Sequence, residues 1–202
     1  MHFHDKKFDD RHAESDVLTY SLMEKLFESK KIKAFRKMRK EEDLEGTDFT
    51  VTFDEFEKEK IQFKLRMWKY QDIPVTRMQP FLGYENHVVG RDYRSLVENK
   101  NKFYFVASQN SKKQFDKISL IEANKLRDIV LEAEAEWFPR ELPWAYISEK
   151  RYDDWISKGI TNRRLKKSKN GTIACFKKNY YEKYGKINYY IPSKYVDRII
   201  VL

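Results

Sequence analysis

Two neighbouring stretches of the sequence, residues 45–53 and 61–66, alternate between apolar and polar side chains. Alternation with a period of two is the pattern of a β-strand with one buried and one polar face. The stretch between them, residues 54–60, is charged apart from Phe56, which predicts an exposed reversal centred near that residue. The two stretches therefore predict an antiparallel hairpin whose apolar face carries Phe49, Val51, Phe53, Ile61, Phe63 and Leu65.

The other face of this hairpin carries a concentrated set of polar side chains. A reversal at Phe56 places Asp48 opposite Lys64, and Thr50 opposite Gln62. Side chains that face each other in an antiparallel pair have Cβ atoms about 4.5–5.5 Å apart. An acid, an amide and a lysine are thus expected on one patch of the sheet. This patch is either a functional site or an ordinary exposed polar face.

Oxygen ligands on such a patch suit a hard divalent cation. Mg²⁺ or Mn²⁺ prefers carboxylate and carbonyl oxygens and leaves positions open for water and phosphate. Asp48 is the expected anionic ligand, with the Gln62 side-chain oxygen and the Phe63 backbone carbonyl beside it. Lys64 would orient the attacking water or stabilise developing negative charge. The residues predict a metal-dependent phosphodiesterase site.

The segment Gly46-Thr47-Asp48 and the later Gln62-Phe63-Lys64 resemble motifs of the PD-(D/E)XK nuclease superfamily. The closer resemblance is to the Asp…Gln-x-Lys variant of Mrr-type restriction endonucleases. In the order of expected elements it covers residues 15–136. It implies an α/β fold (α+β, mixed sheet) with a restriction-endonuclease-like αβββαβ core, and Mg²⁺-dependent cleavage of DNA, most often double-stranded. It also implies catalytic roles for Asp48, Gln62 and Lys64, with Glu24 of the first helix assisting the metal.

The net charge of +9 is unevenly distributed along the chain. Residues 140–202 contain 15 Lys and Arg against 6 Asp and Glu, whereas residues 1–139 contain 26 of each kind. Such clustering is typical of a polyanion-binding surface, although a solvated basic surface that aids solubility is the alternative. We expect a nuclease-like core domain over 1–139 and a basic, β-rich C-terminal extension over 140–202, packed on the core. The expected nucleic-acid contacts are Arg66, Arg163, Arg164, Lys166, Lys167 and Lys169.

Further elements follow from local patterns. Ser15 is the expected N-cap of a helix that ends near Ser29, after a frayed segment over residues 1–12. Residues 67–92 show no sustained period, so we expect an irregular cover or a base-stacking loop. The remaining expectations are helices over 93–99, 122–136 and 149–157, strands over 102–107, 118–121, 173–176, 187–191 and 196–202, and a hairpin turn at Asn170-Gly171. For residues 32–40 we expect a strand, with a short basic helix as the alternative.

Composition excludes several classes of protein. A single cysteine, Cys175, leaves no partner for an internal disulfide and no multi-cysteine zinc site. No apolar run approaches the roughly 18 residues of a membrane span, and the first residues do not resemble a signal peptide. We expect no membrane partner and a cytoplasmic location, in the host cytoplasm if the protein is viral.

Three functions remain open from the sequence. The first is a DNA endonuclease, which would act as a homodimer if it cuts both strands. The second, favoured by Gln62 where the superfamily usually has an acid, is a catalytically inactive nuclease-fold protein, viral or regulatory, that binds nucleic acid. The third is a protein-interaction module whose basic tail contacts an acidic partner.

Overall fold

The computed structural model describes residues 6–39, 46–53, 58–66, 72–80, 87–137, 166–167, 173–175 and 187–202. The chain forms two compact units. Unit one comprises residues 1–71, 101–121 and 196–202, and unit two comprises residues 72–100 and 122–195. The expected domain boundary between residues 139 and 140 lies outside the described residues, and the two units interleave along the chain.

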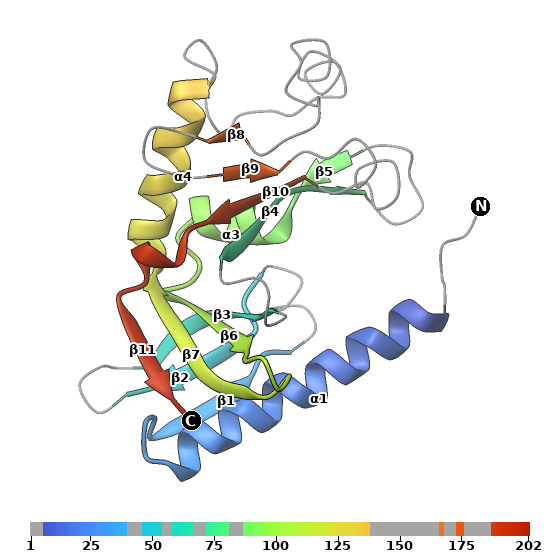
Figure 1. The fold of residues 1–202 in the computed structure, drawn as a ribbon, viewed down its shortest axis with the longest axis vertical. Helices are drawn as coiled ribbons and strands as arrows, with labels where there is room; N and C mark the ends of the chain where they lie inside the picture. The colour runs from blue at the N-terminus through green and yellow to red at the C-terminus, as the bar shows by residue number, and fades with distance from the viewer. Residues whose placement is uncertain are drawn as a thin grey trace. The chain divides into compact units, whose positions relative to one another are not determined.

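Unit one is built on a six-stranded sheet in the order β1-β2-β3-β6-β7-β11 (Figure 1). Strands β1, β2 and β3 form an antiparallel meander, β3 pairs in parallel with β6, and β7 pairs antiparallel with β11. The sheet is therefore mixed, as expected for the α/β class. The strands span Ala34–Lys37 (β1), Phe49–Thr52 (β2), Lys58–Arg66 (β3), Phe103–Gln109 (β6), Phe115–Glu122 (β7) and Arg198–Val201 (β11).

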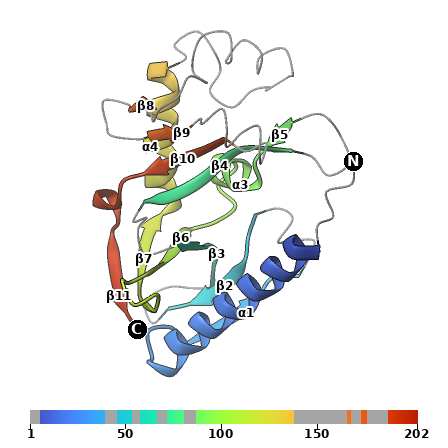
Figure 2. The same cartoon turned by 45° about the vertical axis from the view of Figure 1, so that its right-hand side comes forward.

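Helix α1 (Lys6–Glu28) packs against the apolar face of this sheet through Leu22, Met23 and Leu26. Figure 1 shows it alongside β1 and β2, and Figure 2 shows it beside β2. The expected start at Ser15 is wrong, because the helix begins at Lys6 and Ser15 lies inside it. Residues 6–14 contain no Pro or Gly, so the helix extends beyond the part that carries an apolar stripe.

The expected apolar face of the hairpin forms the core of unit one. Phe49, Val51, Phe53, Ile61 and Phe63 are all buried in one cluster with Leu22, Met23 and Leu26 of α1, and Leu65 packs against it. The Phe49 and Phe63 rings lie with their centroids 6.1 Å apart in an edge-on arrangement. The hydrophobic alternation therefore predicted the correct buried side of both strands.

Unit two contains a five-stranded sheet in the order β5-β4-β10-β9-β8. Two strands replace the irregular cover expected within residues 67–92. Pro74 interrupts the alternating pattern that Ile73 and Val75 would otherwise show. A proline is tolerated at this position of β4 because β5 does not pair there: β5 pairs only with Met78, Gln79 and Pro80. The elements are β4 (Ile73–Pro80), β5 (His87–Val89), α3 (Arg91–Val97), α4 (Ala123–Trp137), β8 (Lys166–Lys167), β9 (Ile173–Cys175), β10 (Ile187–Ile191) and the 3₁₀ turn η1 (Ser193–Tyr195).

The last third of the chain contributes to both sheets. Strands β8 and β9 pair antiparallel, as a hairpin at Asn170-Gly171 requires, although that turn and the expected helix over 149–157 lie outside the described residues. Strand β10 pairs with both β9 and β4, and β11 pairs with β7. The described strands of the expected extension over 140–202 thus contribute to both sheets. No helix in the described part of the chain combines the length and apolar character that a membrane crossing requires.

Candidate functional site

The backbone before β2 presents Asp48 at the edge of the hairpin. Gly46 adopts a φ of 90°, a left-handed conformation that favours glycine, and the Asn101 side-chain amide donates to the Gly46 carbonyl at 2.8 Å. The Asp48 N–H donates to the Ile61 carbonyl at 3.0 Å, and the Met38 N–H donates to the Asp48 carbonyl at 2.9 Å. Backbone hydrogen bonds thus hold Asp48 on both sides.

The Asp48 carboxylate accepts two short hydrogen bonds on one oxygen. The Phe63 N–H donates to Oδ2 at 2.6 Å, and the Gln62 side-chain Nε2 donates to the same atom at 2.7 Å. Oδ2 therefore takes the place of a backbone carbonyl at the end of the ladder between β2 and β3. Hydrogen bonds to an ionised acceptor are stronger than those between neutral groups, so this carboxylate has a fixed orientation.

The strand pairing differs from the expected register. The structure pairs Phe49 with Ile61 and Thr50 with Lys60, which places Asp48 beside Gln62. The expected pairing of Asp48 with Lys64, and of Thr50 with Gln62, is therefore wrong. The shift corresponds to two residues along the partner strand, and a shift of two leaves every side chain on its expected face.

Gln62 and Thr50 are buried polar residues on the polar face of the hairpin. Gln62 is 4% exposed and Thr50 is 5% exposed. Within the described residues, neither Gln62 Oε1 nor Thr50 Oγ1 has a hydrogen-bond partner. Buried polar groups are nearly always paired, and leaving one unpaired costs roughly 1–3 kcal/mol. Both residues are on the face that also carries Asp48, which makes this face the candidate site.

Lys64 and Arg66 follow Gln62 along the same face of β3. Both side chains are half-buried. On the neighbouring strand β6, Tyr104 lies beside Gln62 and Val106 beside Lys64. Residues two apart on a strand are about 6.5 Å apart, so Lys64 is the next residue to Gln62 on this face, although it does not pair with Asp48.

Glu24 lies on the exposed side of α1. The helix covers the apolar face of the sheet, whereas Gln62 and Lys64 are on the opposite face. No hydrogen bond found among the described residues joins Glu24 to Asp48. The structure therefore does not bring Glu24 to the other three expected catalytic residues, and its role stays a prediction.

The expected nucleic-acid contacts are only partly described. Arg66 is on β3 in unit one, while Lys166 and Lys167 form β8 in unit two. Arg163, Arg164 and Lys169 lie outside the described residues.

The oxygen atoms around Asp48 are of the kind that a hard cation prefers. The Asp48 carboxylate contributes the one formal charge among them. In the part of the chain that the structure describes, no three His, Cys, Asp or Glu side chains cluster as a metal site would require. The available oxygens are the Asp48 carboxylate, the unpartnered Gln62 Oε1 and the Phe63 carbonyl. Because the N–H and C=O of a residue in an antiparallel ladder face the same neighbour, the Phe63 carbonyl points towards the Asp48 side.

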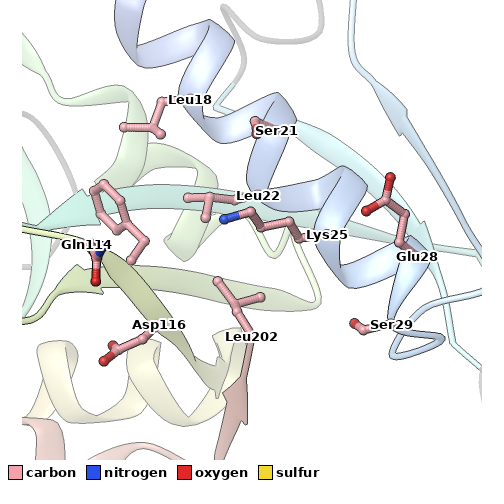
Figure 3. Close-up of a pocket in the computed structure, with 10 residues that line it drawn as sticks. Leu18, Ser21, Leu22, Lys25, Glu28, Ser29, Gln114, Asp116 and Leu202 are labelled. Carbon is pink, nitrogen blue, oxygen red and sulfur yellow. The ribbon is translucent and has the colours of Figure 1, made fainter.

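A groove of about 570 Å³ lies elsewhere in unit one, beside α1 (Figure 3). Sequence patterns did not predict it, because its wall combines residues that are far apart in the chain. None of the expected site residues lines it. Its lining is Leu18, Ser21, Leu22, Lys25, Glu28, Ser29, Gln114, Phe115, Asp116 and Leu202.

Sequence patterns also gave no role to Asn101, which holds the Gly46 turn, or to the Thr50 hydroxyl. A polar residue just before the apolar run at 102–107 was the only signal for the former. No protein-family model, no curated protein and no solved structure matches this chain.

Proposed function

We propose that the protein is a metal-dependent endodeoxyribonuclease with a restriction-endonuclease-like αβββαβ core. The observation that carries the proposal is the Asp48–Gln62 pair, with its unpartnered buried Gln62 oxygen, on the same sheet face as Lys64. An acidic residue, an adjacent carbonyl-type oxygen and a lysine are the groups that metal-assisted phosphodiester hydrolysis needs.

The order of elements along the chain supports this proposal. Helix α1 is followed by the antiparallel strands β1, β2 and β3, and β6 returns in parallel beside β3. Helix α3, which belongs to unit two, precedes β6 in the chain, so the order agrees with the αβββαβ core of the proposal. Strands β4 and β5 are inserted between β3 and α3.

Each residue has a defined part in the proposed reaction. Asp48, the Gln62 Oε1 and the Phe63 carbonyl would hold Mg²⁺ or Mn²⁺, which when bound supplies an activated water and relief of phosphate charge. The Gln62 amide fixes the carboxylate through its Nε2. The Lys64 ammonium orients the attacking water and stabilises negative charge that develops on the phosphate oxygens.

The proposed substrate is DNA. The resemblance to Mrr-type restriction endonucleases implies that this DNA is double-stranded. One site cuts one strand, so cleavage of both strands would take a homodimer. Arg66 on the same face, and the basic residues of the last third of the chain, would contact phosphates.

A second candidate function is DNA binding without catalysis on the same fold. The specific observation in its favour is that Asp48 Oδ2 already accepts hydrogen bonds from both Gln62 and Phe63. An amide in place of a second acid also lowers the negative charge available to a cation. This protein would bind DNA in a salt-sensitive manner and would not cleave it with any divalent metal.

Cleavage of supercoiled plasmid and labelled oligonucleotides in Mg²⁺, Mn²⁺ or EDTA tests the proposal. Lys64→Ala is expected to reduce the cleavage rate by about 10²–10³-fold, the range for loss of one group that stabilises transition-state charge. Lys60→Ala is the matched control, because Lys60 is exposed on the same strand and face, and its rate should stay near wild type.

Unchanged Mg²⁺-dependent cleavage by Lys64→Ala would contradict the catalytic role of this lysine. Wild-type protein that binds DNA but shows no cleavage in either metal would favour the second candidate. Loss of metal-dependent activity in Asp48→Ala, with an unchanged circular dichroism spectrum, is expected under the first.

A further inference from the structure

Thr50 is a buried threonine whose side-chain hydroxyl has no hydrogen-bond partner among the described residues. It lies in the middle of β2, is 5% exposed, and its Oγ1 finds no partner among the described residues. A valine would occupy nearly the same space without the cost of burying an unpaired hydroxyl, which is roughly 1–3 kcal/mol in proteins. The hydroxyl therefore has room for a hydrogen-bond partner that the described residues do not supply.

The register places Thr50 next to the candidate cation ligands. Thr50 pairs with Lys60, so Gln62, two residues further along β3, is its diagonal neighbour on the same face. Diagonal neighbours of this kind have Cα atoms about 7–8 Å apart. Thr50 and Gln62, the two residues whose side-chain oxygens lack a partner among the described residues, are thus neighbours on the face that also carries Asp48.

The two oxygens are suited to hold a water molecule between them. They make no hydrogen bond to each other in the described structure. A threonine hydroxyl both donates and accepts, whereas Gln62 Oε1 only accepts. A buried water needs two to four polar partners, and this region offers the hydroxyl, the amide oxygen and the nearby carboxylate.

We propose that Thr50 is a positioning residue of the cation site, which holds, together with Gln62, a water molecule that belongs to the shell of a bound divalent cation. This inference rests on the proposed function, because the cation itself is part of that proposal. Thr50 contacts neither the cation nor the DNA directly. Residues that orient the ligands of a metal in this way typically affect its affinity by about 10–100-fold.

Binding of Mn²⁺ to the DNA-free protein, measured from the signal of unbound Mn²⁺ by electron paramagnetic resonance, tests the role of the hydroxyl. Thr50→Val is expected to weaken Mn²⁺ binding about tenfold, and Thr50→Ser to retain wild-type affinity because it keeps the hydroxyl. Thr50→Ala, a second variant without the hydroxyl, should show the same loss as Thr50→Val. In EDTA the thermal midpoint of Thr50→Val should equal or exceed that of wild type, since an unpaired polar group is removed.

Thr52→Val is the matched control. Thr52 is on the same strand and face, is half-buried, and lies one step further from Asp48. Its substitution should leave Mn²⁺ affinity unchanged, so that a loss in both threonine variants would overturn a specific role for Thr50.

The outcomes separate this inference from the proposed function. Wild-type Mn²⁺ affinity in Thr50→Val, together with loss of binding in Asp48→Ala, would overturn the role of Thr50 and leave the cation site intact. Equal Mn²⁺ affinity in wild type and Asp48→Ala would overturn the cation site and the inference with it.

Discussion

The nitrogen and the oxygen of the Gln62 amide differ in their hydrogen bonding. Its Nε2 donates to Asp48 Oδ2 and its Oε1 remains unpartnered within the described residues. A glutamate at this position would bring two carboxylates together, and like charges at such a distance disfavour joint ionisation. The amide avoids that repulsion and still offers an oxygen. Under the proposed function, this site forms without a cation and binds one with modest affinity, since fewer charged ligands weaken a site.

Asn101 determines where Asp48 lies, through the turn that precedes it. Its side chain is 5% exposed and donates to the Gly46 carbonyl at 2.8 Å. Asn101→Ala would leave this buried carbonyl without its donor, so we expect the free energy of unfolding to fall by about 1–3 kcal/mol. Urea denaturation followed by circular dichroism measures this change.

The matched control is Lys102→Ala, at the exposed position that follows Asn101 in the chain. Truncation of this exposed side chain is expected to change the free energy of unfolding by under about 0.5 kcal/mol. Equal losses in the two variants would show that the bond to Gly46 contributes little.

At the scale of elements, the hairpin shows which features of a strand pair the sequence determines. The alternation predicted the buried side of β2 and β3 because burial of Phe49, Ile61 and Phe63 is incompatible with the opposite face. The pairing itself depends on the length of the turn. The stretch 54–60 has no Gly or Asn to specify a turn type. The sequence therefore could not distinguish the two registers that differ by two residues, because both bury the same side chains.

Strand β4 was missed for a different reason. Its partner β10 comes from the last part of the chain, so no local pattern signals the pairing. Pro74 also reads as a strand breaker, although the structure places it where only one neighbour, β10, is paired with β4. The polar and aromatic residues of this segment therefore suggested a loop.

Gly90 lets the start of helix α3 approach strand β4 closely. A Cβ atom built at Gly90 would lie 1.9 Å from the Thr76 carbonyl oxygen, which is backbone and cannot rotate away. The φ of Gly90 is −59°, so close approach rather than backbone conformation requires glycine here. Asp92 strengthens the same junction by accepting a hydrogen bond from the Thr76 N–H at 3.3 Å.

Gly90→Ala is therefore expected to lower the free energy of unfolding by about 1–3 kcal/mol, the usual cost of forcing extra atoms into a packed contact. Thermal and urea denaturation of wild type and variant measure it. Arg94→Ala, at an exposed position of the same helix, serves as the control. A Gly90→Ala protein as stable as the control would show that α3 can shift away from β4 at no cost.

At the scale of the whole chain, segments distant in sequence complete each unit. The parallel pairing of β3 with β6 requires the chain to leave unit one after β3 and to return near residue 101. The final strand, β11, returns again and pairs with β7. The sequence predicted the apolar strands β6 and β11 but not the strands with which they pair. A pairing between distant segments leaves no periodic signal in the sequence.

The return of β11 makes the end of the chain part of the core of unit one. Ile200 is 4% exposed and belongs to the same cluster as Phe105 and Ile118, whereas the neighbouring Ile199 is 58% exposed. Ile200→Ala is expected to lower the free energy of unfolding by about 2–5 kcal/mol, as for other large-to-small core substitutions. Ile199→Ala removes the same atoms from the same strand and should change it by less than about 0.5 kcal/mol. Urea denaturation of both variants compares them directly, and similar losses would show that β11 does not pack on unit one. A loss confined to Ile200→Ala would mean that packing of β11 stabilises unit one, which contains the candidate site.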